Sequence, residues 1–367
     1  MDSPADTSTA SVNRALHLIN SDSLHLNLLA AQEIRRLTKT SHRTRRLLAP
    51  AIPPLVSMIR SPSPPEFHQA ALLALLNLAV KDDKNKITIV DVGGLEPIIS
   101  FLQSKCMNLQ DYATATLLTL SASATLKPTI GASGAIPFLV DILSHGSPQA
   151  KAEAITVLYN LSTYPNNLVA ILSANPMPSL VDFLKVDKKH SRTAEKCIAL
   201  IECLVGFDNG RTALTFEEGG LLTVVEVLEN GSLQSRGHAV GALLTMCEAD
   251  RIKYRELILR EGVIPGLLEL TVQGTSSSQS NARTLLRLLR DSLHPRSGFQ
   301  PDTLEDVVCT IMSQIDSDDQ SSKAKKMLAE MVQVSMEQSL RHLQQRALEG
   351  TPLEMSVSTC PSKASLK

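Results

Sequence analysis

The residue types that perform most enzyme chemistry are present in this sequence, but they are scattered. The nine histidines occur singly, and none of the six cysteines stands in a CxxC pair. The HExxH, GxSxG, Walker and dinucleotide-binding motifs, which position a metal, a nucleophile or a phosphate, do not occur. The sequence therefore predicts a protein that is not an enzyme and that has no metal, no cofactor and no small-molecule substrate.

Two glycine pairs, Gly93-Gly94 and Gly219-Gly220, are similar to parts of phosphate-binding loops. Each pair, however, precedes an apolar cluster that recurs along the chain, and glycine commonly ends a helix. The interpretation as helix stops is therefore favoured.

A cluster of six basic residues, with no acidic residue among them, occupies twelve positions near the N-terminus. It has three interpretations: a solvated surface, a binding site for an acidic or phosphorylated partner segment, or a signal for nuclear import or lipid headgroups. A second charged block, residues 302–319, contains six acidic residues and no basic one, and is interpreted as solubilising. The basic residues are Arg35, Arg36, Lys39, Arg43, Arg45 and Arg46.

The overall composition argues against several classes of partner. The 36 basic and 37 acidic residues leave a formal charge of −1, which provides no general attraction for nucleic acid. Residues 1–14 contain no apolar run of the kind found in signal peptides. The longest apolar stretch, residues 70–80, is about half of the roughly 20 residues that cross a bilayer. We expect a cytoplasmic or nuclear protein with no membrane span.

A phrase that recurs along the sequence indicates which helices would position any binding residues. A small residue, an aliphatic residue, often a proline, and an apolar cluster recur six times, with spacings of 40 to 45 residues between the equivalent positions 53, 97, 137, 178, 223 and 265. Glycine followed by proline is typical of one helix ending and the next beginning. Each unit then continues with a short amphipathic helix, a polar break and a longer helix rich in Ala and Leu. The pattern predicts three helices per unit and no β structure.

These units resemble the armadillo repeat, whose second helix opens with a G-[AG]-I-P-type phrase and whose third ends with an A-L-x-N-L-S-type phrase. Gly134-Ala135-Ile136-Pro137 matches the first phrase, while Leu76-Asn77-Leu78-Ala79 and Tyr159-Asn160-Leu161-Ser162 match the second. The variety is similar to the armadillo region of plant U-box ubiquitin ligases and their armadillo-only relatives. The resemblance implies an all-α, right-handed superhelical solenoid of about six to seven three-helix repeats, with a C-terminal capping helix.

The resemblance also implies where partners bind. In peptide-binding armadillo proteins, the Asn of the closing phrase of each third helix contacts the backbone of a ligand that lies in a concave groove. A Trp one turn earlier is absent here, since the chain contains no Trp, so a receptor of the importin type is not expected. All of the equivalent positions except Cys203 are taken as candidate contact residues. The equivalent positions, called the ladder positions below, are Arg36, Asn77, Thr119, Asn160, Cys203, Thr245 and Arg287.

The predicted organisation runs from end to end of the chain. Residues 1–13 are expected to be disordered, 14–50 to form an N-terminal cap with a partial first repeat, and 51–290 to form the repeats. Residues 291–302 are expected to be a linker, 303–348 a helical cap, and 349–367 a disordered tail. Terminal units of a solenoid must cover its exposed core, so the long apolar helix at 323–348 is interpreted as a cap rather than as a contact surface.

The predicted function is that of a non-catalytic protein-interaction scaffold or adaptor, with plant signalling suggested by the resemblance alone. Its partners would be proteins or peptides, among them acidic or phosphorylated segments, kinases or ubiquitin-ligase components. The alternative is a substrate-recognition or regulatory subunit associated with a ubiquitin ligase. Ligase activity of the chain itself is not expected, because a U-box needs about seventy residues and only about two dozen precede the repeats.

Overall fold

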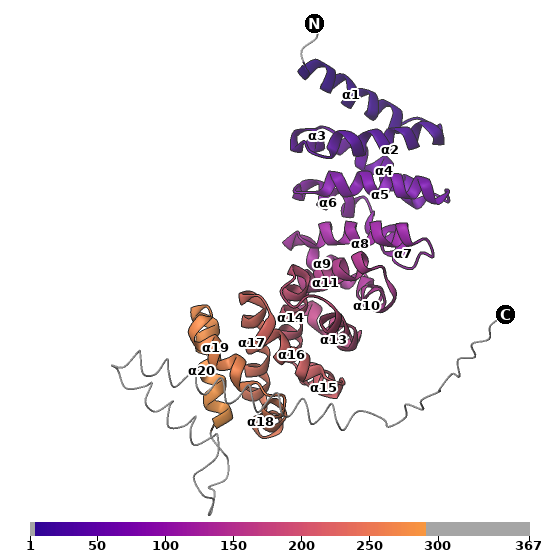
Figure 1. Cartoon of the computed structure of the whole chain (residues 1–367). Helices are drawn as coiled ribbons and strands as arrows, with labels where there is room; N and C mark the ends of the chain where they lie inside the picture. Colours follow the sequence, from indigo (N-terminus) through magenta and orange to yellow (C-terminus); the bar gives the residue numbers. More distant parts are fainter. Residues whose placement is uncertain (1–3, 291–367) are drawn as a thin grey trace, which may run out of the picture. The chain divides into compact units, whose positions relative to one another are not determined.

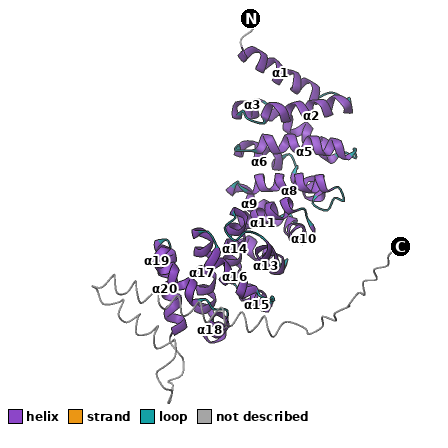
Figure 2. Cartoon of the chain, viewed as in Figure 1, coloured by secondary structure: helices purple, strands orange, loops and turns teal. Residues whose placement is uncertain are grey.

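Helices joined by short turns follow one another over residues 4–290, which are the residues that the computed structural model describes (Figures 1 and 2). No strand occurs in this part of the chain, so the all-α class is confirmed. The α-helices are α1 (Pro4–Ile19), α2 (Leu24–Thr38), α3 (His42–Leu47), α4 (Ile52–Arg60), α5 (Pro65–Ala79), α6 (Asp83–Asp91), α7 (Leu95–Phe101), α8 (Met107–Ser121), α9 (Lys127–Ala132), α10 (Ala135–His145), α11 (Pro148–Ser162), α12 (Asn166–Ser173), α13 (Met177–Val186), α14 (Arg192–Val205), α15 (Asp208–Phe216), α16 (Gly220–Asn230), α17 (Leu233–Ala249), α18 (Arg251–Arg260), α19 (Ile264–Gln273) and α20 (Ser276–Arg290). Two short 3-10 helices, η1 (Ala49–Ala51) and η2 (Ala124–Leu126), precede α4 and α9.

From α3 onward the helices form successive units of three: α3, α4 and α5 are the first, second and third helices of one unit, and α6 begins the next. The third helix is the longest helix of each of these units. Figure 1 shows these third helices in successive layers, and neighbouring third helices pack on one another from α2 through to α17. Their Ala- and Leu-rich sides form the core: Leu75 and Leu78 of α5, and Leu158 and Leu161 of α11, are fully buried. The layered arrangement is that of an armadillo-type solenoid, in which each repeat contacts its neighbours. The third helices are α2, α5, α8, α11, α14, α17 and α20.

Glycine conformation explains the helix boundaries that the recurring phrase predicted. Gly93, Gly134, Gly219 and Gly262 have φ values of 68 to 81°, and each lies between the first helix of a unit and the second. Asn175 occupies the same boundary with a φ of 51°. Residues with a side chain rarely adopt this left-handed region, and Asn tolerates it better than most. The glycine pairs are therefore helix stops, as the sequence indicated.

Replacing Gly134 measures the free-energy cost of this left-handed turn by itself. A Cβ at Gly134 would meet no atom within 4 Å, so its only penalty is conformational. We expect Gly134→Ala to lower the free energy of unfolding by about 1 kcal/mol. Gly134→Asn should cost less, because Asn175 already occupies the equivalent turn. Urea unfolding followed by circular dichroism measures both variants, and equal losses for Ala and Asn would contradict the explanation.

The N-terminal unit begins earlier than predicted. Residues 1–13 were expected to be disordered, but α1 starts at Pro4 and packs against α2. The physical reason is an apolar stripe at helical spacing, since Val12, Ala15 and Ile19 are 3%, 0% and 2% exposed. The predicted boundary at residue 14 is therefore wrong, and the segment extends the predicted N-terminal cap.

Buried asparagines of the first helices connect neighbouring repeats. Asn167 of α12 donates through Nδ2 to the carbonyl of Leu161 at 3.1 Å and to that of Lys127 at 3.0 Å. Asn85 of α6 donates in the same way to Leu78 at 2.9 Å and to Arg45 at 3.3 Å. One acceptor in each pair belongs to the last turn of the third helix of the preceding unit, and the other to the first helix of that same preceding unit. Each Asn therefore satisfies a helix end and fixes the spacing of two repeats.

Three predicted segments lie outside the described residues: the linker 291–302, the helical cap 303–348 and the tail 349–367. They stay predictions. Within residues 4–290, no single helix is both long and apolar enough to cross a membrane; only the pair Ala124–Ala132 and Ala135–His145, bent by 87°, passes that test jointly. The central residues of this pair, Ile130, Ile136 and Leu139, are at most 1% exposed in the solenoid core.

Candidate functional site

The ladder positions all lie on third helices, which the repeat register predicted. Arg36 of α2 and Arg287 of α20 are exposed, and the five positions between them are half-buried. Contacts between neighbouring third helices are made at or beside several of these positions, so they form one surface along the stack. We call this surface the third-helix face. Nothing in the structure tests whether it binds a ligand, so the contact assignment stays a prediction.

Asn77 and Asn160, the two ladder asparagines, already have partners within the protein. Asn77 Nδ2 donates to the carbonyl of Arg35 on α2 at 2.9 Å, and Asn160 Nδ2 donates to Ser121 Oγ on α8 at 3.0 Å. Each bond reaches the third helix one repeat back. An Asn amide has a second hydrogen and a carbonyl oxygen, so either residue retains groups for a ligand. Both residues nevertheless have a structural role that the sequence did not reveal.

Three of the remaining candidates make only local contacts, and the side chain of the fourth, Thr245, forms no hydrogen bond among the described residues. Thr119 Oγ1 donates to the carbonyl of Ala115 in its own helix at 3.1 Å. Arg36 pairs with Glu33 at 2.6 Å, and Arg287 Nη2 contacts Thr284 Oγ1 at 3.3 Å. Their side chains are therefore not needed to join repeats.

Two contacts across the third-helix face involve residues that the sequence analysis did not single out. Lys196 Nζ of α14 lies 4.3 Å from the centre of the Tyr159 ring on α11, a cation–π geometry. Glu202 Oε2 of α14 lies 2.6 Å from His238 Nδ1 of α17. Both Tyr159 and Glu202 immediately precede a ladder position. That adjacency is the sequence signal that could have identified them.

Charge is unevenly distributed along the third-helix face. Carboxylates lie in its middle, at Glu202 and at Glu153 of α11. Burial raises the pKa of Glu153; the hydrogen bond from Gln149 opposes this shift and the nearby Asp111 carboxylate adds to it. Arginines occupy both ends, at Arg36 and at Arg287. The charges on this face are therefore arginines at its two ends and carboxylates, together with Lys196, in its middle.

The cysteines near this face differ in burial. Cys197 and Cys247 are buried, and burial raises the pKa of the Cys247 thiol to about 11, which keeps it protonated. Cys203 is half-buried at its ladder position. Burial is also the main cause that raises the pKa of its thiol.

One member of the predicted basic cluster is not on the surface. Arg45 is 7% exposed, and its Nε and Nη2 donate to the carbonyls of Thr38 at 2.9 Å and Lys39 at 3.1 Å. These carbonyls belong to the C-terminal end of α2, where helical partners are missing and positive charge is favourable. The prediction that Arg45 belongs to a basic binding patch is therefore wrong. Its guanidinium caps the C-terminal end of α2.

The other basic residues of the cluster are exposed. Among the described residues, Arg35, Lys39 and Arg43 have no ion pair, while Arg46 lies 3.5 Å from the buried carboxylate of Asp82. Arg36 pairs with the exposed end of Glu33 in its own helix, so three exposed side chains have no ion pair, and the guanidinium of Arg46 adds a fourth exposed charge although it lies near Asp82. We call Arg35, Lys39, Arg43 and Arg46 the basic surface.

Comparison with known proteins places this architecture in a family. Residues 11–304 match the family described as the plant U-box protein ARM repeat region, which is most of the chain. The chain belongs to this family. The match also includes most of α1, in agreement with the earlier start of the first unit.

Among curated proteins, the chain is similar to several U-box proteins of Arabidopsis thaliana. It is 33% identical to U-box domain-containing protein 45 over 61% of this chain and 29% of that protein. It is 31% identical to U-box domain-containing protein 17 over 80% of this chain and 40% of that protein. The chain thus spans well under half the length of these two relatives.

Solved structures show the same fold. A designed armadillo repeat protein aligns with a TM-score of 0.56 at 21% identity, over 65% of this chain and 99% of the designed one. An engineered protein aligns over 91% of both chains with a TM-score of 0.63 at 17% identity. At these identities the likeness supports the armadillo solenoid and nothing beyond the fold.

Proposed function

We propose that this ARM repeat protein is a non-catalytic scaffold or adaptor, in the cytoplasm or nucleus, that binds partner protein segments along its third-helix face. The observation that carries the proposal is the unbroken stack of third helices from α2 to α17, whose ladder positions are half-buried or exposed on one surface. A surface of repeating units spaced along a stack suits an extended chain, which can contact one repeat after another.

The basic surface supports a more specific proposal for one end of this ligand. Arg35, Lys39, Arg43 and Arg46 present charge at the first repeat, and of the four only Arg46 has a carboxylate partner, Asp82, among the described residues. Guanidinium and ammonium groups form strong hydrogen bonds with carboxylates and phosphates. We propose that an acidic or phosphorylated segment binds there, whether it comes from a kinase, a ligase component or another signalling protein.

A second candidate function is that of a substrate-recognition or regulatory subunit of a ubiquitin ligase. The relationship to U-box proteins favours it, since the family match covers residues 11–304. Under this proposal the chain would supply the bound substrate segment, and a catalytic partner would supply the ligase chemistry.

Obstruction of the third-helix face tests the scaffold proposal. We expect Thr119→Arg with Thr245→Arg to remove most partners recovered by affinity purification from native tissue, because two long side chains would occupy half-buried ladder positions. Exposed ends of these side chains stay solvated, so stability should change little. The recovered proteins, identified by mass spectrometry, also separate the two functions, since ligases and their substrates would favour the second.

The matched control is Thr88→Arg on α6. Thr88 is half-buried and donates to the carbonyl four residues earlier at 2.9 Å, as Thr119 does at 3.1 Å, but it lies on a first helix. It should leave recovery unchanged. If the Thr119/Thr245 variant retains every partner, the third-helix face is not the binding surface.

A further inference from the structure

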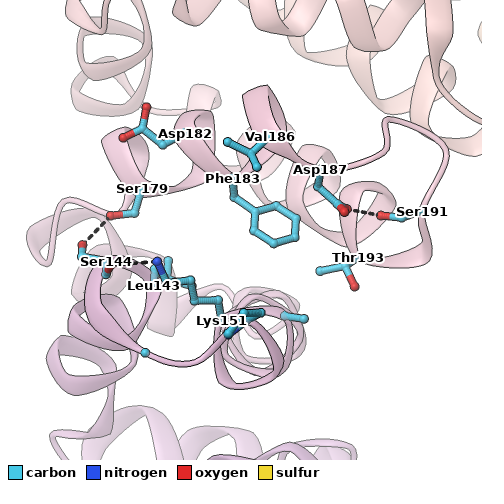
Figure 3. Close-up of a pocket in the computed structure, with 13 residues that line it drawn as sticks. Leu143, Ser144, Lys151, Ser179, Asp182, Phe183, Val186, Asp187, Ser191 and Thr193 are labelled. Carbon is cyan, nitrogen blue, oxygen red and sulfur yellow. Dashed lines mark hydrogen bonds between the residues drawn. The ribbon is translucent and has the colours of Figure 1, made fainter. Parts of the chain in front are cut away.

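A hollow of about 640 Å³ lies away from the ladder positions (Figure 3). Its lining comes from the end of the second helix α10, one side of the second helix α13, the beginnings of the third helices α11 and α14, and the turns that join them. On α11 the lining residues Lys151 and Ala152 precede the ladder residue Asn160 by two turns. The hollow therefore contains no ladder position, and a ligand in it needs none of the contacts proposed for those positions.

The base of the hollow is apolar, and its walls are held by hydrogen bonds. Leu143 is buried and Phe183 is half-buried, and Figure 3 shows the Phe183 ring near the centre of the lining. Ser144 Oγ and Ser179 Oγ lie 2.9 Å apart and join α10 to α13. Lys151 Nζ donates to the Ser144 carbonyl at 2.8 Å, which leaves two of its three hydrogens for other acceptors.

One wall exists because a turn is longer than its neighbours. The turn between α13 and α14 comprises residues 187–191, whereas the equivalent turns on either side are residues 146–147 and 231–232. The longer turn is fixed at both ends. Asp187 accepts a hydrogen bond from Ser191 Oγ, which also accepts from the Ala194 amide at 2.9 Å, and Lys189 pairs with Glu226 at 3.0 Å.

The rim combines an exposed apolar side chain with uncompensated positive charge. Val186 is 90% exposed, the largest value among the large hydrophobic residues described. Lys188 and Arg192, on the same turn and at the start of α14, are exposed and have no ion pair among the described residues. The nearby carboxylate of Asp182 is already paired with Lys185 at 3.2 Å. Asp187, the other lining carboxylate, is hydrogen-bonded to the neutral Ser191 hydroxyl. Against this one charge stand Lys151 of the lining and Lys188 and Arg192, which adjoin the lining residues in sequence, so the net charge at the rim is positive.

We infer that this hollow binds a short segment of a partner protein in which a Leu, Ile or Phe side chain is flanked by Asp or Glu. The apolar side chain enters against Leu143 and Phe183, and the flanking carboxylates lie near Lys188 and Arg192. A peptide segment fits better than a small molecule, because covering Val186 requires an occupant that extends beyond the hollow onto its rim. The acidic residues on either side of the apolar one are attracted to Lys188 and Arg192, which have no ion pair among the described residues.

Selection of peptides on the immobilised full chain tests this inference. A displayed library of random twelve-residue peptides is the probe, and the affinities of recovered peptides are measured by fluorescence anisotropy. We expect a consensus with one large apolar residue next to acidic ones. Val186→Asp should weaken these peptides about tenfold or more, since a carboxylate at the rim repels the flanks and removes apolar contact. Lys188→Glu with Arg192→Glu should weaken them similarly and reduce the salt dependence.

The matched control is Val169→Asp on α12, an exposed valine at 63% that lies outside the hollow. It should leave the affinities unchanged, and Val186→Ser replaces Val186→Asp if the latter fails to fold. Three outcomes overturn the inference: no peptide is selected, the consensus lacks acidic residues, or binding survives both rim variants. Loss of a dimer in Val186→Asp by analytical ultracentrifugation would overturn it as well, because the occupant would then be a second copy of the chain.

Discussion

Asn167→Ala is expected to lower the free energy of unfolding by roughly 2–3 kcal/mol, although the residue touches no candidate binding surface. The side chain is 5% exposed and donates to two backbone carbonyls, of Leu161 and Lys127, in different elements. Alanine leaves both acceptors without this donor in a region that little water reaches. An unsatisfied buried polar group costs about 1–3 kcal/mol, more than the net value of the bond that is lost.

The loss of stability in Asn167→Ala should be confined to the repeats around residue 167. In a solenoid, stability is close to a sum over repeats and the interfaces between them. Hydrogen exchange measured by mass spectrometry should therefore show faster exchange in α9, α11 and α12, with little change in α2 or α5. The neighbouring Asn166→Ala is the control, because Asn166 is exposed and makes only a long contact of 3.3 Å to the Tyr164 hydroxyl. Equal losses for the two variants would contradict the explanation.

Gly131 of α9 provides an independent test of the same contact. A Cβ at Gly131 would lie 1.9 Å from Asn167 Oδ1, so Gly131→Ala should displace the amide and destabilise the protein. In the Asn167→Ala background the added methyl group has room, and alanine is the better helix former by up to about 1 kcal/mol. The double variant should therefore be no less stable than Asn167→Ala alone. Additive losses would show that the two residues do not act through one contact.

The sequence predicted the repeats because they are encoded locally. Glycine at a left-handed turn, a following proline and an apolar helix lie within a few residues of one another, as at Gly134 and Pro137. These features gave the helix order and the ladder positions without any knowledge of the packing. Helix α1 was missed for the same reason: it has no such phrase, and only the spacing of Val12, Ala15 and Ile19 marks it.

What the sequence did not predict depends on contacts about one repeat away. The partner of Asn77 is 42 residues earlier, and one partner of Asn167 is 40 residues earlier. The hollow beside Phe183 requires two second helices and a long turn to meet, so no single segment encodes it. Only the register of the stack brings these groups together, and a pattern within one unit does not contain that information.

Arg45 and Arg43 are separated by one residue in the basic cluster, yet we expect replacement of Arg45 to lower stability and replacement of Arg43 to weaken binding. Arg45→Ala should lower the free energy of unfolding by roughly 2–3 kcal/mol, since charged hydrogen bonds contribute about 1.5–3 kcal/mol each and part of this loss is recovered by relaxation. The loss arises because the carbonyls of Thr38 and Lys39 at the end of α2 lose a buried donor. Urea unfolding provides the measurement.

Arg43→Glu should instead leave stability within about 0.5 kcal/mol, because the residue is exposed and has no ion pair among the described residues. Its effect should appear in binding. The affinity for an acidic phosphoserine peptide, measured by fluorescence anisotropy, should fall and lose part of its salt dependence, since exposed charges are screened over about 8 Å at physiological ionic strength. Arg45→Lys should leave this affinity unchanged while remaining less stable than the wild type, because a single ammonium replaces a guanidinium that reaches both carbonyls. If Arg45→Lys, which keeps the positive charge, weakens the peptide as much as Arg43→Glu does, then the Arg45 guanidinium itself takes part in binding, and its role is not confined to the end of α2.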